Sequence, residues 1–264
     1  SVMLDGAVGG QWIINEYDPG RSILIKPIFA WQVADYALFR KADQFLHMSA
    51  TICGFDAYAG VLGLKEGEFE CLEIPNPIPV ANRRVYVVAN QKISGNYDIK
   101  KLASDVDKLI LRHGEQNGII HTVSYKLANE LYVNSSLKHR MLVSKDREEI
   151  MNELKQVNTG RIVLSAGFVR GFDFKGDMSR YQIQLKVPFD FLGDPLVKLN
   201  AERRGDWYAR SAILKLVQSC GRSIRGVDDY ATTYIMDMNF KRLYSQNRDL
   251  FPSWFCDSVV MKPE

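Results

Sequence analysis

The sequence predicts an α/β protein with a doubly wound, mostly parallel sheet and helices on both faces. From residue 84 onward, short apolar runs rich in β-branched residues alternate with longer amphipathic segments. Such strand–helix alternation is typical of a parallel sheet covered by helices. Hydrophobic residues make up 46% of the chain and charged residues 25%, which is the balance of a globular protein.

The segment before residue 84 is less regular. Two apolar runs, residues 23–25 and 45–48, are predicted to form short buried strands. Residues 75–79 hold three prolines in five positions, which excludes a helix or a central strand there. We therefore expect a linker at residues 75–79.

After the linker, the pattern predicts individual elements. Residues 98–113 carry apolar side chains at helical spacing, with Asp98 as the N-cap and Gly114 just past the end. Because ligands bind beyond the carboxyl ends of parallel strands, the loops that follow the strands are where chemistry is expected. The remaining strands are expected at residues 84–88, 118–123, 141–143, 161–164, 181–187 and 234–238, and the remaining helices at 125–132, 146–156 and 207–219.

Composition excludes several classes of protein. The net charge is only +3, so any nucleic-acid-binding charge must be local. No apolar run approaches the ~20 residues of a membrane span, and the N-terminus lacks the pattern of a signal peptide. The four cysteines and four histidines show no metal-ligand spacing, so no metal site is predicted and the cysteines are expected to be reduced core residues.

The strongest candidate for chemistry is the set Gln218, Arg222 and Arg225. These residues are spaced by four and three positions, so they share one exposed face if the helix from residue 207 continues through them. Two guanidinium groups on one face favour a multivalent anion such as phosphate. The alternative is a surface arginine pair in a salt-bridge network.

Three further segments place polar residues just after strands. Asp173 follows Gly171 in a loop where its carboxylate can reach a ribose hydroxyl or an arginine, or can cap a neighbouring helix. Gly171 and Gly176 are spaced as in a phosphate-binding loop, but the required lysine is absent. Two hydroxyl pairs, which suit phosphate contacts or simple turns and caps, are Ser49 with Thr51 and Thr122 with Ser124.

The order and spacing of these segments resemble the C-terminal half of the XPD/DinG-like helicases of superfamily two. The resemblance covers roughly residues 20–240. Residues 45–52 (FLHMSATI) look like motif III, 118–127 (GIIHTVSYKL) like motif IV, 167–176 with Val-Pro-Phe at 187–189 like motif V, and 218–225 with Asp229 and Asp237 like motif VI.

This resemblance implies two RecA-like domains with ATP in the cleft between them. Arg222 and Arg225 would contact the γ-phosphate, one of them as an arginine finger, and Gln218 would hold that face in register. Asp173, beside Gly171, would contact the ribose or couple to motif VI. Ser49 and Thr51 would relay between the ATP cleft and DNA, and Thr122 and Ser124 would contact the DNA backbone.

The chain also departs from the family pattern. Arg170 stands where motif V commonly has glutamate, and Tyr230 stands where glycine usually follows the motif VI aspartate. Neither G-x-x-x-x-G-K-[ST] nor D-E-x-H occurs. We therefore expect a part of a longer protein, with residues 1–75 the tail of the first RecA-like domain and 76–264 the second. ATP and Mg²⁺ would be held mainly by the preceding half, where an iron–sulfur cluster of the family type would also lie.

The leading hypothesis is thus the C-terminal motor half of an ATP-dependent DNA helicase that is inactive on its own. Its partners would be single-stranded or forked DNA and the N-terminal RecA-like domain of the same protein. We expect it to act in DNA repair, either in the cytoplasm at the nucleoid or in the nucleus, and not to be secreted. One alternative is a non-catalytic nucleic-acid-binding or assembly domain with this fold. Another is a small-molecule enzyme using Asp173, although no base–nucleophile pair supports it.

Overall fold

The computed structural model describes residues 12–18, 22–143, 147–156, 159–166 and 174–261. The chain divides into two compact units, each formed by two stretches of sequence. Unit 1 comprises Ser1–Ile74 and Phe189–Leu214, and unit 2 comprises Pro75–Pro188 and Lys215–Glu264. No helix among the described residues is both long enough and apolar enough to cross a membrane.

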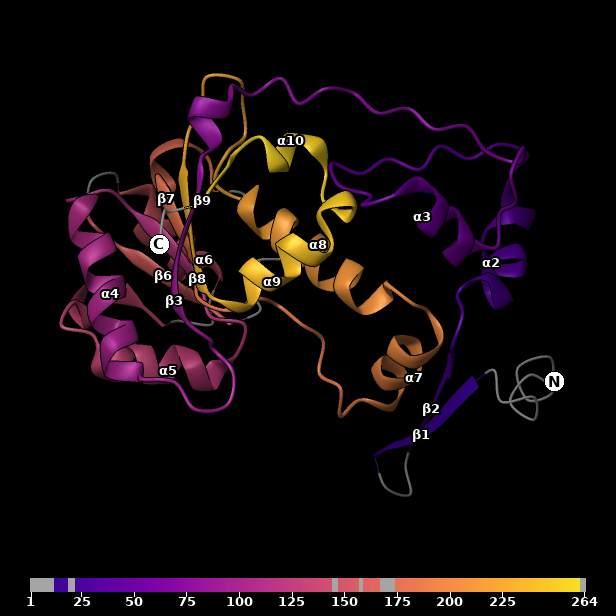
Figure 1. The fold of residues 1–264 in the computed structure, drawn as a ribbon, viewed down its shortest axis with the longest axis horizontal. Helices are drawn as coiled ribbons and strands as arrows, with labels where there is room; N and C mark the ends of the chain where they lie inside the picture. The colour runs from indigo at the N-terminus through magenta and orange to yellow at the C-terminus, as the bar shows by residue number, and fades with distance from the viewer. Residues whose placement is uncertain (1–11, 19–21, 144–146, 157–158, 167–173, 262–264) are drawn as a thin grey trace. The chain divides into compact units, whose positions relative to one another are not determined.

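Unit 2 is built on a parallel sheet (Figure 1). Seven strands of the described chain pair in the order β5-β6-β4-β7-β8-β3-β9, and every pair is parallel. The predicted parallel sheet is therefore confirmed. The strands are β3 (Val85–Gln91), β4 (Gly118–His121), β5 (Met141–Leu142), β6 (Ile162–Ser165), β7 (Tyr181–Gln184), β8 (Thr232–Asp237) and β9 (Val259–Met261).

Helices pack on both faces of this sheet, as predicted. On one face, helices α4 (Ile99–Arg112) and α5 (Tyr125–Asn134) bury leucine and valine side chains against the inner strands. On the other face, α6 (Arg147–Lys155) buries Ile150 and Leu154 in a smaller cluster with residues of β4 and β6. Two further helices near the C-terminus are α9 (Asn239–Gln246) and α10 (Ser253–Cys256).

Helix α4 forms where the sequence predicts it. The Asp98 side chain accepts a hydrogen bond from the Lys101 N–H at 3.0 Å, which satisfies one of the free donors of the first turn. At the other end, Gly114 adopts φ +57°, a conformation that glycine reaches without steric cost. Both ends were thus readable from local sequence alone.

Unit 1 contains an antiparallel pair of strands, β1 (Trp12–Asp18) and β2 (Ser22–Pro27), and β2 includes the strand expected at residues 23–25. Its helices are α2 (Trp31–Ala37), α3 (Phe55–Leu62), α7 (Pro195–Arg203) and the larger part of α8 (Trp207–Cys220). Short 3₁₀ turns in the two units are η1 (Phe39–Lys41), η2 (Val80–Arg83), η3 (Lys138–Arg140), η4 (Gly176–Met178) and η5 (Arg248–Leu250).

The buried strand predicted at residues 45–48 is wrong. This stretch is not in a strand, and the side chains of Leu46 and Met48 are 83% and 82% exposed. The aromatic residues of this stretch make local contacts instead: the ring of Phe45 lies edge-on to Phe39, and the ring of His47 lies edge-on to Tyr58. The apolar run therefore does not mark a strand of a sheet.

Candidate functional site at the carboxyl edge of the sheet

Three polar residues form a row across the carboxyl ends of neighbouring strands. Ser165, His121 and Gln184 are the last residues of β6, β4 and β7, and they are paired in register. All three are buried. Within the described part of the chain, Ser165 Oγ and Gln184 Nε2 have no hydrogen-bond partner. Unsatisfied buried polar atoms are uncommon, so this edge differs from an ordinary apolar core.

His121 is tied to the end of helix α8 through Gln182. The Gln182 amide nitrogen donates to the main-chain carbonyl of Cys220, and its amide oxygen lies 3.2 Å from His121 Nε2. Because that oxygen can only accept, the imidazole must carry its proton on Nε2. The pKa of His121 is lowered to about 4, mainly by burial and in part by the positive charge of Arg222, while the hydrogen bond to Gln182 acts in the opposite direction.

The predicted single helix face of Gln218, Arg222 and Arg225 is wrong. Helix α8 ends at Cys220, so Gln218 lies in its last turn while both arginines lie beyond it. The chain turns inward because Ser223 and Ile224 are buried. Gln218 and Arg225 are exposed and Arg222 is half-buried, and the three residues do not share one helix.

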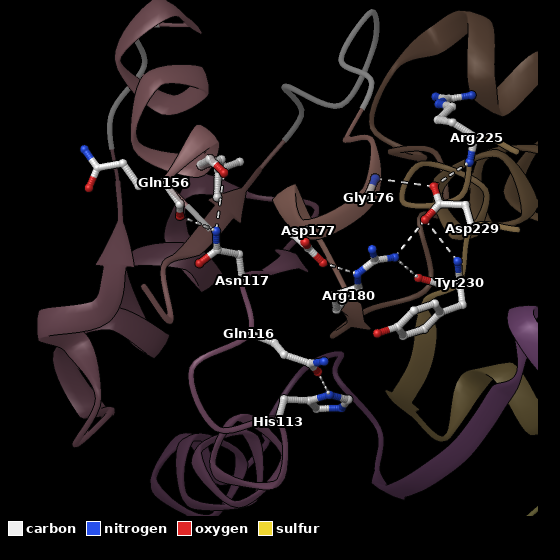
Figure 2. A network of polar contacts seen from close by, with 11 residues as sticks. His113, Gln116, Asn117, Gln156, Gly176, Asp177, Arg180, Arg225, Asp229 and Tyr230 are labelled. Carbon is white, nitrogen blue, oxygen red and sulfur yellow. Dashed lines mark hydrogen bonds and ion pairs between the residues drawn. The ribbon is translucent and has the colours of Figure 1, made fainter. Parts of the chain in front are cut away.

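Asp229 fixes the loop that carries Arg225 (Figure 2). Its carboxylate accepts hydrogen bonds from the main-chain N–H of Arg225 at 3.0 Å and of Gly176 at 3.4 Å. The same carboxylate pairs with Arg180 at 2.8 Å, and both side chains are nearly buried, at 11% and 13% exposure. Arg180 also contacts Asp177 at 2.7 Å and lies over the Tyr230 ring. The side chain of Asp229 therefore holds the main chain at Arg225 and at Gly176 in place.

Asp237 plays a similar part between strands. It is fully buried at the end of β8 and accepts hydrogen bonds from the N–H groups of Ile93 and Asn239 through one oxygen and of Val187 through the other. These bonds tie together the segments that follow β3, β7 and β8. Both aspartates noted after residues 218–225 are thus structural anchors.

The hydroxyl pair that follows β4 is engaged within the fold. Thr122 is fully buried and its hydroxyl lies 3.2 Å from the carbonyls of Ser124 and Ser165. Ser124 caps α5 by accepting from the Leu127 N–H at 3.2 Å. Between them, Val123 has φ +65°, which is rare for a β-branched residue. The cap alternative accounts for Ser124, and its contact with DNA stays a prediction.

The remaining predicted residues lie elsewhere. Ser49 and Thr51 belong to unit 1, where Ser49 Oγ bonds the main chain of Thr51 in a local turn and Thr51 is buried. Gly171 and Asp173 lie outside the described residues. No group of three or more potential ligands that could hold a metal ion occurs in the parts that are described. The guanidinium groups of Arg222 and Arg225 suit phosphate oxygens.

Residues 109–258, more than half of the chain, match the family model described as the helicase C-terminal domain. The chain belongs to this family. The match includes the row at the carboxyl edge, both arginines and the two structural aspartates, and it confirms the resemblance to XPD/DinG-like helicases.

A curated relative of this helicase C-terminal domain is the ATP-dependent DNA helicase YoaA of Escherichia coli (strain K12). It is 23% identical over 214 residues, which cover 75% of the chain and 33% of the relative. The domain therefore spans about a third of the length of that protein.

Solved structures share the fold. A structure of XPD helicase matches with a TM-score of 0.65 at 15% identity, and the match covers 98% of this chain and 49% of the XPD chain. A structure named XPD_APO matches with a TM-score of 0.66 at 15% identity, and the match covers 98% of this chain and 56% of that chain. Saccharomyces cerevisiae Dbp5 bound to RNA and ADP BeF3 has 0.52 at 16% identity and covers 88% of this chain and 54% of its own. These matches confirm the RecA-like helicase fold.

Three residues of the helicase C-terminal domain escaped the sequence prediction: Ser179, Arg180 and Gln182. None belongs to a recognised motif, and each contacts motif VI from about 40 to 50 residues away in the chain. The available signal was the pair of glutamines that alternates with Tyr181 and Ile183 in β7, and all four residues prove to be buried, where polar side chains need partners.

Proposed function

We propose that this chain is the second motor domain of an ATP-dependent DNA helicase, in which motif VI presents Arg222 and Arg225 to the γ-phosphate of ATP. The observation that supports this most is the anchoring of Arg225. Its main-chain N–H is held by Asp229, which is itself paired with Arg180, while its side chain lies at an exposed position. A fixed backbone under an exposed guanidinium is what a donor to a ligand on another domain requires.

The two guanidinium groups would neutralise the charge that develops on the transferred phosphoryl oxygens. Their planar forks match phosphate geometry, and the fold would hold them there before the reaction, so little reorganisation is needed. Gln218, exposed in the last turn of α8, would complete this surface. ATP supplies the phosphoanhydride bond that is broken, and its β-phosphate and Mg²⁺ would be held by a separate phosphate-loop domain.

The other motif residues complete the proposal. Gly171 and Asp173 would face the ribose or motif VI. Ser124, with the N–H groups at the start of α5, would contact phosphates of single-stranded or forked DNA. Thr122 would act through the shape of that turn, because its hydroxyl is buried against main-chain carbonyls. Ser49 and Thr51 would couple the nucleotide cleft to DNA.

The test is a DNA-stimulated ATPase assay on the full-length protein that carries this chain. Arg222→Ala and Arg225→Ala should each lower kcat by about 10³-fold or more, the range of arginine fingers. Lysine at either position should restore only part of the rate, because an ammonium lacks the planar fork. The control is Arg242→Ala, which removes an exposed arginine bonded to Gln246 on α9 and should leave kcat unchanged.

Melting curves of the same variants separate chemistry from folding. Arg225→Ala should melt within a few degrees of the parent protein, because exposed substitutions change stability by only about 0.5 kcal/mol. Arg222 is half-buried, so Arg222→Ala is expected to cost more stability, and its kcat is corrected for the folded fraction. Activity that merely tracks the folded fraction would make the arginines structural and refute the proposal. DNA binding by a full-length protein that hydrolyses no ATP would favour the non-catalytic binding domain instead.

A further inference from the structure

A four-residue segment, Ser179 to Gln182, touches motif VI at three separate points. The amide of Gln182 donates to the Cys220 carbonyl, which precedes Arg222. The hydroxyl of Ser179 lies 2.7 Å from that of Ser223, which stands between the two arginines. The side chain of Arg180 pairs with Asp229, whose carboxylate holds the Arg225 N–H (Figure 2).

We propose that this segment is the template that positions both motif VI arginines, with Ser179, Arg180 and Gln182 as positioning residues and His121 orienting Gln182. The inference rests on the proposed function, because it assigns a role to residues that act through Arg222 and Arg225. The three contacts fall before, between and after the arginines, so they set the course of the loop over its whole length.

The contact of Gln182 satisfies the carbonyl of the last residue of helix α8. The last carbonyls of a helix have no partner within it, and an unpaired carbonyl in a buried place is costly. Cys220 is buried at the helix end, and the Gln182 amide satisfies its carbonyl. Arg222 follows two residues later, so the direction in which it leaves the helix depends on this bond.

The contact of Ser179 holds the middle of the loop. Both serines are fully buried. Ser179 Oγ also lies 3.1 Å from the carbonyl of Tyr181, to which it can only donate, so Ser223 supplies the proton of the serine–serine bond. The Phe174 N–H donates to the Arg222 carbonyl at 3.4 Å. Arg222 is thus bonded through its own main chain, between the contacts made by Cys220 and Ser223.

His121 supports the orientation that the Cys220 carbonyl gives to the Gln182 amide. With its proton on Nε2, the imidazole donates to the Gln182 oxygen and leaves the amide nitrogen to face Cys220. The lowered pKa keeps the imidazole neutral at physiological pH, which avoids a second positive charge near Arg222. A flipped Gln182 would set its oxygen against the Cys220 carbonyl and lose that bond, and its nitrogen would require the other tautomer of His121.

A matched control exists on the opposite edge of the sheet. Asn117 is also fully buried, and its amide donates to the carbonyls of Leu154 and Gln156 at the end of α6. The Asn117 side chain also accepts from the Arg161 N–H at 2.9 Å and from the Thr159 hydroxyl at 3.2 Å. Gln182→Met and Asn117→Leu therefore each remove a buried amide that bonds a carbonyl at a helix end, and of the two only Gln182 bonds motif VI through its side chain. Asn117→Leu removes more hydrogen bonds, so it should lose at least as much thermal stability as Gln182→Met.

The experiment compares these two variants in the full-length protein, with kcat and KM for ATP measured at saturating DNA and corrected for folded protein. Gln182→Met should lower kcat at least tenfold with KM changed less than twofold, whereas Asn117→Leu should leave both within twofold. Arg222→Ala runs in parallel. If Arg222→Ala leaves kcat intact, the proposed function fails. If it lowers kcat while Gln182→Met behaves like Asn117→Leu, the positioning role alone is overturned.

A second readout needs no ATP turnover. Nuclear magnetic resonance titration of the His121 ring reports whether Arg222 lies near it. Arg222→Ala should raise the pKa of His121, because a neighbouring positive charge is removed. In the Gln182→Met background the same substitution should have a clearly smaller effect, since Arg222 has lost its place. An equal effect in both backgrounds would contradict the inference.

Discussion

Acidification should destabilise unit 2 through the buried His121. Burial, helped by the charge of Arg222, lowers the pKa of His121 from 6.5 to about 4 in the folded chain. The unfolded chain therefore binds a proton in a pH range where the folded chain excludes it. Stability is unaffected above about pH 6.5 and is lost progressively as the pH falls toward 4. At about 1.4 kcal/mol for each tenfold change in proton affinity, the loss by pH 4 is roughly 3 kcal/mol.

Denaturant unfolding between pH 7 and pH 4 measures this loss. Trp254 lies in unit 2, and its fluorescence reports that unit once Trp12, Trp31 and Trp207 are replaced by phenylalanine. His121→Gln should reduce the slope of unfolding free energy against pH across this window, and the exposed His139→Gln should not. A slope that is the same in His121→Gln and in the parent chain would refute the reasoning.

Three further outcomes are expected. The isolated chain should show negligible ATPase with or without single-stranded DNA, because it lacks a phosphate-binding loop, and robust phosphate release that disappears in Arg225→Ala would contradict this. Its DNA binding, measured by fluorescence anisotropy, should be weak and should fall as salt is added, so tight salt-insensitive binding would indicate base stacking instead. Asp229→Ala breaks a nearly buried ion pair and should lower the free energy of unfolding by about 3–5 kcal/mol, measured by denaturant unfolding. Asp249→Ala, at an exposed position, should lower it by about 0.5 kcal/mol at most. Equal losses in the two variants would show that the carboxylate of Asp229 does not anchor the loop.

The elements that sequence alone predicts are those with local causes. Helix α4 has its cap, its apolar face and its terminal glycine within 17 residues of chain, and each formed as expected. The parallel sheet was equally predictable, because its strands are apolar and alternate with helices. The strand predicted at residues 45–48 was wrong because a short apolar run does not reveal whether another strand is available to pair with it.

The candidate site was predictable by residue type and not by geometry. Arginines and an aspartate at motif VI spacing are visible in the sequence, yet the end of helix α8 depends on Ser223 and Ile224 entering the core. The contacts that shape the loop join residues 38, 44 and 49 positions apart, through Gln182, Ser179 and Arg180. Tertiary hydrogen bonds over such distances override helix propensity and leave no periodic signal.

The backbone at Val123 carries a cost that the fold tolerates. A β-branched residue at φ +65° is disfavoured by about 1–3 kcal/mol, and the turn is held by the buried Thr122 hydroxyl on one side and the Ser124 cap on the other. Glycine would relax this position without disturbing either neighbour, so Val123→Gly is a substitution from which the domain would gain stability. Valine at the junction of β4 and α5 therefore lowers the stability of the domain and gives it a stiff turn at the edge where it is proposed to bind DNA.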